Sequence, residues 1–171
     1  VLDSSVNIAW NEIRHRAQLT KDYQAAPRVL ANESRLGQVF LNLLLNAAQA
    51  IEDGAANRNQ IFVRTRTATD GSCIIEIEDT GYGISPEIAR RMFDPFFTTK
   101  PVGIGTGLGL SICQSIVTAM LGSIADESTI GKGSIFRVVL PAAPLSEGTV
   151  DKDQETTAMP TLAVAARVLI V

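Results

Sequence analysis

Apolar residues recur at the spacing of an α-helix in three long stretches of the chain, and each stretch predicts a helix. The stretches are residues 3–16, about 32–53 and about 107–121. In the first, the apolar residues that share one side are Val6, Ala9, Trp10 and Ile13. A short fourth helix is expected over about 86–91, because Pro86 fits the first turn of a helix.

The expected helix ends carry typical capping residues. Asp3 or Ser4 can cap the first helix, and Asn32 can cap the second. Gly54 and Gly122 follow the second and third helices, where a glycine commonly ends a helix.

Alternating and β-branched stretches predict extended segments instead. They cover residues 17–23, 28–31, 60–68, 73–79, 123–128 and 133–140. Asp70-Gly71 lies between the third and fourth, which is a strong signal for a hairpin turn. Residues 92–107 contain Gly, Pro, Thr and Phe without periodicity, and this predicts a long functional loop.

The pattern changes after the last of these strands, so we expect residues 1–141 to form one domain. Residues 142–165 begin with a stretch rich in Ala, Pro, Glu, Thr and Asp and predict a linker. Residues 166–171, "ARVLIV", predict a short apolar strand. Because the chain starts at Val1, we expect it to be a fragment of a longer protein.

Composition narrows the possible functions. The chain has 171 residues, 46% hydrophobic and 19% charged, with a formal net charge of −3. This composition is ordinary for a soluble domain. The negative net charge argues against binding of nucleic acid that is mainly electrostatic, so no nucleic-acid partner is expected. Cys73 and Cys113 lack metal-ligand spacing and are expected to be buried thiols. His15 is the one histidine, and we expect it on the solvated surface.

A polar stripe runs along the long second helix. Its members recur at intervals of three or four and are Gln38, Asn42, Asn46, Gln49 and Asp53. A solvent-facing stripe would explain them, but such stripes favour Lys and Glu, and asparagine is a poor helix former. An amide oxygen can also ligate Mg²⁺ without adding charge. The stripe is therefore a candidate metal or phosphate site.

Asp79 ends the strand 73–79, and strand parity puts it on the apolar face with Ile75 and Ile77. An aspartate before a glycine is commonly a turn cap. At the end of a buried face it can instead accept a hydrogen bond from an amine such as that of adenine. Gly81 and Gly83 would then let the backbone approach a flat ligand.

A run of alternating glycines opens directly into the third helix. Its members are Gly103, Gly105, Gly107 and Gly109. Glycines before a helix N-terminus form an anion site, because free N–H groups and the helix dipole point at the ligand. The run does not follow a strand, as a dinucleotide fold requires, and its last glycine is not followed by the lysine of a Walker loop. Lys100 precedes the run and is either a solvated loop residue or a phosphate contact.

Five motifs in order resemble those of the histidine protein kinase ATP-binding domain. They are "NLLLNA" (42–47), "DTGYGI" (79–84), "FDPFFTTK" (93–100), "GTGLGL" (105–110) and "GKGSIF" (131–136). The resemblance implies the Bergerat fold, which gyrase, mismatch-repair and heat-shock chaperone ATPases share. That fold is a two-layer α/β sandwich with a mixed sheet of about five strands and three helices on one face.

By position, the resemblance implies ATP and Mg²⁺ as cofactors. Asn46 would ligate Mg²⁺, Asn42 would hold metal-bound water or phosphate, and Lys100 would approach the β- and γ-phosphates. Phe93, together with Phe96 and Phe97, would anchor the lid over the nucleotide. The nucleotide-binding residues would be Asn46, Asp79, Gly81, Gly83, Ile84, Phe93, Lys100, Gly105, Thr106, Gly107, Leu108, Gly109 and Ser134. We also expect a mobile lid at about 98–106, because it is glycine-rich and has few large apolar anchors.

Asn42 separates two functions within this fold. The related ATPases carry a water-activating glutamate there, and an amide cannot act as a general base. The resemblance therefore implies a kinase that holds ATP for transfer rather than hydrolysis, with a Bergerat-fold ATPase or an ATP-sensing module as alternatives. Gln49 departs from the Lys or Arg of many family members, and Lys100 could compensate.

The resemblance also implies partners outside this chain. These are the dimerisation and histidine phosphotransfer domain of the same protein, in a homodimeric parent, and a response regulator or receiver domain. The acceptor histidine should lie outside the chain, since His15 is followed by Arg16 within the catalytic resemblance. Residues 166–171 resemble the first strand of a receiver domain. The domain is expected in the cytoplasm, with a parent protein that could be attached to the membrane.

Overall fold

A computed structural model describes residues 1–54, 56–100, 105–144 and 168–169. The helices are α1 (Leu2–Ile13), α2 (Glu33–Gln49), α3 (Pro86–Ala89) and α4 (Gly109–Ala119). The strands are β1 (Gln18–Tyr23), β2 (Val29–Leu30), β3 (Gln60–Thr67), β4 (Cys73–Asp79), β5 (Ser123–Thr129), β6 (Gly133–Leu140) and β7 (Val168–Leu169).

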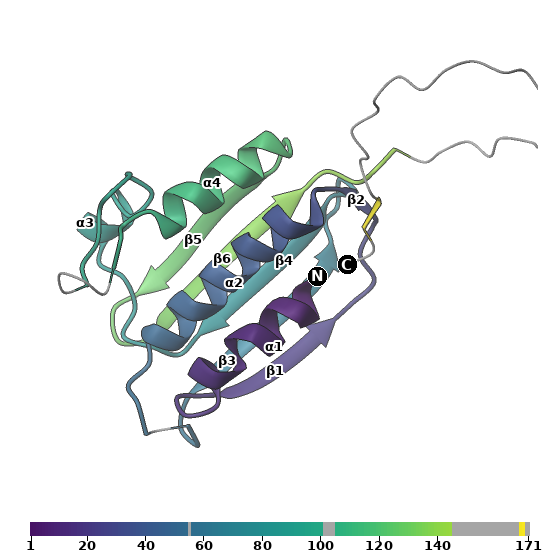
Figure 1. The fold of residues 1–171 in the computed structure, drawn as a ribbon. Helices are drawn as coiled ribbons and strands as arrows, with labels where there is room; N and C mark the ends of the chain where they lie inside the picture. The colour runs from purple at the N-terminus through teal and green to yellow at the C-terminus, as the bar shows by residue number, and fades with distance from the viewer. Residues whose placement is uncertain (55, 101–104, 145–167, 170–171) are drawn as a thin grey trace, which may run out of the picture.

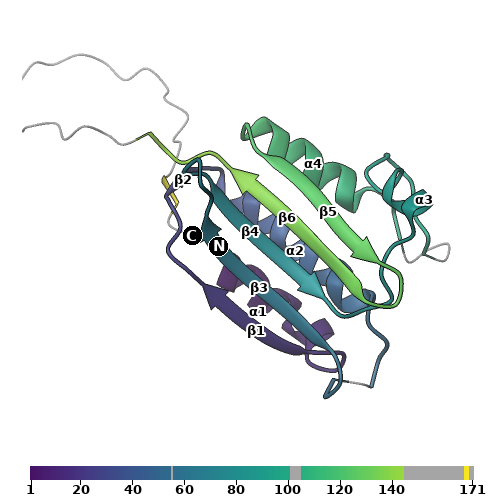
Figure 2. The ribbon, with the colours of Figure 1, turned by 180° about the vertical axis from the view of Figure 1, so that it is seen from behind.

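Five strands form one mixed sheet in the order β1-β3-β4-β6-β5. Strand β1 runs parallel to β3, and the other neighbours are antiparallel. Helices α1, α2 and α4 cover one face of this sheet (Figure 1). Seen from behind, the strands lie in front of the helices (Figure 2). The predicted two-layer α/β sandwich is therefore confirmed.

The core lies between the helices and the inner face of the sheet. Helix α2 is its centre, because it packs against α1, α4 and β4. The largest fully buried side chains include Phe40, Leu36, Leu43, Leu44, Ile75 and Ile77. Cys73 and Cys113 are buried free thiols, as expected, and His15 is exposed. None of the described helices is long and apolar enough to cross a membrane.

The first helix differs from the prediction at both ends. It begins after Val1 without a side-chain cap and ends at Ile13 rather than at residue 16. Neither Asp3 nor Ser4 caps it, because both lie within the helix and its N-cap position is Val1. The Asp3 Oδ1 instead accepts hydrogen bonds from Lys21 Nζ at 2.6 Å and Tyr23 Oη at 3.2 Å. Trp10 is predicted on the apolar side of this helix, but 44% of its surface is exposed.

The second helix begins as predicted and ends earlier. The Asn32 side chain caps it by accepting a hydrogen bond from the Arg35 backbone N–H at 3.0 Å. The helix ends at Gln49 instead of about residue 53. The carbonyl of the next residue, Ala50, turns away to accept the Tyr82 N–H at 3.0 Å. This bond ties the end of α2 to the turn that follows β4.

Helix α4 starts at Gly109, because Gly107 has a φ of 66°, which a right-handed helix excludes. At its other end the left-handed position is occupied by Leu121, with a φ of 58°, and not by Gly122. Gly122 is needed for another reason: a Cβ there would lie 2.4 Å from the Val139 carbonyl oxygen.

The chain after β6 is described only in part. Ala143 donates its N–H to the Arg28 carbonyl at 2.6 Å, beside β2. Strand β2 pairs antiparallel with β7, joining Leu30 to Val168. Most of the expected linker and the remainder of the expected strand 166–171 lie outside the described residues.

Candidate nucleotide-binding site

A cavity of about 310 Å³ opens between α2, the end of β4, the segment before α4, and β6. The predicted site residues in its lining are Asn42, Asn46, Asp79, Gly83, Ile84, Lys100, Gly105, Thr106, Gly107, Gly109 and Ser134. Residues far apart in sequence thus meet at one place. Gly81, Phe93 and Leu108 were expected there too, but they lie outside this lining.

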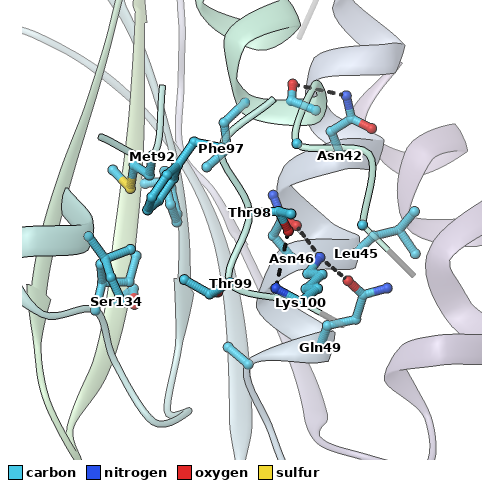
Figure 3. A pocket seen from close by; sticks show the side chains of 18 of the residues that line it. Asn42, Leu45, Asn46, Gln49, Met92, Phe97, Thr98, Thr99, Lys100 and Ser134 are labelled. Atoms are coloured by element: carbon cyan, nitrogen blue, oxygen red, sulfur yellow. Dashed lines mark hydrogen bonds between the residues drawn. The ribbon is translucent and has the colours of Figure 1, made fainter. Parts of the chain in front are cut away.

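Helix α2 turns the middle of its polar stripe into the cavity. Asn42, Asn46 and Gln49 lie along one side of the pocket (Figure 3). The two asparagines are half-buried, so this part of the stripe does not simply face solvent. Gln38 and Asp53, at the two ends of the stripe, are not in the lining. The Asn42 Nδ2 donates to the Gly109 carbonyl oxygen at 3.4 Å, which joins α2 to the start of α4.

Lys100 reaches this stripe from the loop that precedes the glycine run. Its Nζ donates to the Asn46 Oδ1 at 3.1 Å and also to the Gln49 Oε1 (Figure 3). Burial lowers the pKa of the Lys100 ammonium. The loop lysine therefore supplies a cation at the position where α2 itself offers only amides.

Asp79 lies on the inner face of β4, as parity predicted, and only 3% of its surface is exposed. Burial raises the pKa of its carboxyl group to about 6, although hydrogen bonds from the Gly81 and Ser134 backbones oppose the shift. The Gly81 N–H lies 2.8 Å from its Oδ1. Ser134 is paired directly opposite Asp79 on β6 and is also buried. This end of the pocket thus presents a buried carboxyl beside a hydroxyl.

The glycines after β4 serve close packing of the backbone. A Cβ at Gly81 would lie 2.2 Å from the Ala50 carbonyl oxygen, so Gly81 lets the turn approach the end of α2. Gly83 has a φ of 73°, and a Cβ there would lie 2.2 Å from the Thr129 carbonyl oxygen. Gly83 lines the cavity, whereas Gly81 lies outside its lining and allows the turn to pack against the Ala50 carbonyl.

The three phenylalanines of the loop have different environments. Phe93 and Phe97 pack against the core, and Phe97 also lines the cavity. Phe96 does not anchor the loop with its side chain, which is 75% exposed. Its backbone N–H instead donates to the Gly107 carbonyl at 2.9 Å. The mobile lid is predicted at about 98–106, and residues 101–104 of it lie outside the described residues.

Sequence reasoning did not single out the apolar wall of the pocket. That wall includes Leu45, Ile88, Met92, Leu110 and Phe136, and the loop adds Thr98 and Thr99. All of them except Met92 belong to the five motifs or to α3, and Met92 directly precedes "FDPFFTTK". The apolar ones resemble ordinary core positions in the sequence. Tyr82 also lines the cavity although its side chain is exposed, and no periodic pattern in the sequence indicates it.

The fold and this lining define a nucleotide-binding domain. The family model described as "Histidine kinase-, DNA gyrase B-, and HSP90-like ATPase" matches residues 31–144. The chain therefore belongs to this family of ATP-binding domains.

A curated relative from this family is a histidine kinase. The signal transduction histidine-protein kinase AtoS of Escherichia coli (strain K12) is 41% identical over 129 residues, which cover 75% of this chain and 20% of AtoS. The chain thus spans about a fifth of the length of this relative.

Solved structures agree with this placement. The nucleotide-free catalytic domain of histidine kinase ThkA matches with a TM-score of 0.70 and 28% identity, over 84% of this chain and 92% of that one. Full-length ShkA in complex with AMPPNP matches with a TM-score of 0.69 and 26% identity, over 84% of this chain and 30% of that one. The domain is an ATP-binding catalytic domain of the histidine kinase type.

Proposed function

We propose that this domain binds Mg-ATP and positions its γ-phosphate for transfer to a histidine on the dimerisation domain of the same protein. The observation that carries the proposal is the absence of a general base beside the amides. Among the described residues that line the cavity, the one carboxylate is Asp79. It pairs with Ser134, which lies on the side of the pocket away from Asn46 (Figure 3).

An amide stripe can bind a metal–phosphate group but cannot deprotonate water. The side chain of Asn42 is engaged as a donor to the α4 backbone and the Cys113 sulfur. Such a site favours holding the γ-phosphate intact until a nucleophile arrives, and positioning then supplies much of the catalysis. A Bergerat-fold ATPase would need a base at this end of the pocket.

The residues present fit one Mg²⁺ ion that is bound mainly through phosphate. The described residues hold no cluster of three or more His, Cys, Asp or Glu side chains that could bind a metal alone. Asn46 offers a hard amide oxygen to the cavity. Mg²⁺ prefers such oxygens together with phosphates and several waters. When bound, it would neutralise charge on the β- and γ-phosphates.

We assign Asp79 and Ser134 to the base and the glycine run to the phosphates. A buried carboxylate accepts the amino group of adenine, and the apolar wall of Ile84, Met92 and Phe136 suits a purine ring. Gly105, Gly107 and Gly109 lead into the N-terminus of α4, where backbone N–H groups favour anions. Lys100 adds a positive charge at the same end.

The partners follow from this role. The acceptor histidine would come from the dimerisation domain of a homodimeric parent, and the phosphoryl group would pass to a response regulator or to a receiver domain. Residues 166–171 would be the first strand of such a receiver in a hybrid kinase. Because the substrate is ATP, we place the domain in the cytoplasm, whether or not the parent protein is attached to a membrane.

Mg-dependent binding of an ATP analogue to the 171-residue chain tests the site. Asn46→Ala and Asp79→Ala should each weaken binding at least tenfold, whereas Gln114→Ala, an exposed amide on α4, should not change it. Unchanged affinity in both site variants would refute the assignment.

A second measurement separates transfer from hydrolysis. The chain should hydrolyse ATP slowly on its own, and it should label the histidine of its dimerisation domain when that domain is added. Steady hydrolysis that Asn42→Ala abolishes would favour the ATPase. ATP binding without any histidine labelling in the full-length protein would favour an ATP-sensing module.

A further inference from the structure

Ser128, near the end of β5, lies outside the cavity lining but makes three hydrogen-bond contacts through one oxygen. Its Oγ accepts the Ile84 backbone N–H at 2.7 Å. It also lies 2.9 Å from the Gly133 carbonyl oxygen and 2.9 Å from the Ser134 Oγ. Two of these partners, Ile84 and Ser134, line the nucleotide pocket.

The proton inventory of a hydroxyl fixes the direction of these bonds. A serine hydroxyl has one proton to donate and two lone pairs that accept. The Gly133 carbonyl can only accept, so Ser128 donates its proton there. Its lone pairs then receive the Ile84 N–H and the Ser134 O–H. This is the arrangement in which Ser128 is fully satisfied.

The consequence appears at Ser134. Because its proton is directed to Ser128, its remaining lone pairs make it an acceptor toward the pocket. Asp79, paired opposite Ser134 on β4, presents carboxylate oxygens at the same end when it is ionised. Two acceptors side by side favour a group with N–H donors, such as the 6-amino group of adenine, and disfavour a 6-oxo group.

We propose that Ser128 is a positioning residue that sets purine specificity, because it holds the Ser134 hydroxyl as an acceptor toward the base. The inference rests on the proposed function, since it takes the base to lie at the Asp79–Ser134 end. Ser128 acts through Ser134 and does not itself touch the nucleotide.

Competition binding with ATP and inosine triphosphate tests the proposal, with the 171-residue chain and a fluorescent ATP analogue as probe. The wild-type chain should bind ATP at least tenfold more tightly than inosine triphosphate. Ser128→Ala frees the Ser134 proton to rotate and donate into the pocket. The ratio of the two affinities should then fall about three- to tenfold, which corresponds to the free-energy contribution of one hydrogen bond. Ser128→Thr, which keeps a hydroxyl, should retain the preference.

The ratio of the two affinities separates positioning from a structural role. Loss of the Ile84 contact alone would loosen the turn and weaken both nucleotides equally, so an unchanged ratio in Ser128→Ala would overturn the proposal. Ser134→Ala should also reduce the ratio, and adding Ser128→Ala to it should reduce the ratio no further. Additive effects of the two substitutions would overturn the proposal as well.

Three further outcomes decide the remaining cases. If Ser128→Ala does not fold, Ser134→Ala and Ser128→Thr still decide, since an unchanged ratio in the first or a lost preference in the second contradicts the inference. Suppose that the wild-type chain binds ATP, that Asp79→Ala abolishes binding, and that Ser128→Ala leaves the ratio of the two affinities unchanged. Only this inference then fails. If the wild-type chain binds neither nucleotide, the proposed function fails and the inference fails with it.

Discussion

The Lys100 ammonium lies 3.1 Å from the Asn46 side-chain oxygen, which is the atom we assign to Mg²⁺. A metal ion and an ammonium cannot share that oxygen at close range, because like charges repel in a partly buried site. Lys100 would therefore have to leave Asn46 if Mg²⁺ took that oxygen, and it could then contact the phosphates of the nucleotide. Nucleotide binding would thus replace the contact between Lys100 and Asn46 by a contact between Lys100 and phosphate.

The first prediction concerns the charge that Lys100 supplies. Lys100→Ala should weaken Mg-ATP binding about 10- to 100-fold, because a charged hydrogen bond to phosphate contributes about 1.5–3 kcal/mol. Gln49→Lys in the Lys100→Ala background should recover part of the loss, since it supplies the cation from α2. Titration calorimetry of the single and double variants measures both effects.

The exposed Lys132, in the β5–β6 turn, provides the matched control. Lys132→Ala removes the same charge from the chain and should leave the affinity within twofold of wild type. Equal losses from Lys100→Ala and Lys132→Ala would mean that only net charge matters and that Lys100 has no specific contact.

The second prediction follows from the raised pKa of Asp79. In the folded state the pKa of the Asp79 carboxyl group is about 6, whereas the ordinary pKa of an aspartate side chain is 3.8. Between these values the folded state binds more protons than the unfolded state, so this group makes stability fall as pH rises through the window. Above pH 6 the ionised, buried carboxylate costs roughly 2–3 kcal/mol.

Asp79→Asn should therefore raise the free energy of unfolding at pH 8 and change it little at pH 4. The same substitution should weaken ATP binding, because an amide offers a poorer acceptor to the adenine amino group. Chemical denaturation at the two pH values measures the first effect, with the exposed Asp53→Asn as control. A variant that is equally stabilised at both pH values would show that the effect is not the ionisation of Asp79.

The third prediction concerns the glycine at the base of the glycine-rich segment. Gly107 has a φ of 66°, and a Cβ there would lie 2.4 Å from the Phe96 carbonyl carbon. Gly107→Ala should thus force the loop away from the start of α4 and reduce ATP affinity at least tenfold. Equilibrium binding of the ATP analogue measures the change.

Gly71 separates this collision from backbone strain. It has a φ of 85° in the β3–β4 turn, with nothing within 4 Å of an added Cβ. Gly71→Ala should cost about 1–2 kcal/mol of stability through its left-handed conformation alone. It should leave nucleotide affinity unchanged. Loss of affinity in both variants would point to general destabilisation instead.

Local rules explain which features the sequence could predict. The Asn32 cap, the Asp70-Gly71 hairpin and the buried position of Asp79 depend on neighbours within a few residues. The motif order then predicts that the amides, Asp79 and the glycine run lie around one pocket. The lining of the cavity includes Asn42, Asn46, Asp79, Gly105, Gly107 and Gly109.

Other features depend on contacts that the sequence does not display. Gly81 is required by the Ala50 carbonyl, which is distant in sequence, and not by the cavity. The motif predicts Phe96 as an apolar anchor, yet its backbone N–H bonds to Gly107 while its ring is exposed. No motif indicates Ser128, because its three hydrogen-bond partners are brought together only by the β5–β6 hairpin and the turn after β4.

The last prediction uses a second buried acid on β4 whose pH dependence has the opposite sign. Glu76 lies on the outer face of the sheet with 8% of its surface exposed. Burial alone would raise the pKa of its carboxyl group, but hydrogen bonds from Arg137 at 2.6 Å and Arg66 at 3.1 Å lower it overall. Its contribution to stability is therefore complete at neutral pH and is lost as the pH falls through the folded-state pKa.

Glu76→Gln should lower the free energy of unfolding at pH 7 by about 1–3 kcal/mol, because it leaves two arginines without their shared carboxylate. The deficit should shrink as the pH is lowered, since the wild-type carboxylate is then also neutralised. Nucleotide affinity should not change, because Glu76 faces away from the pocket and is absent from its lining. Denaturation curves from pH 3 to pH 7 measure the effect, and a deficit that is constant over this range would show that the arginine pair does not stabilise the fold through charge.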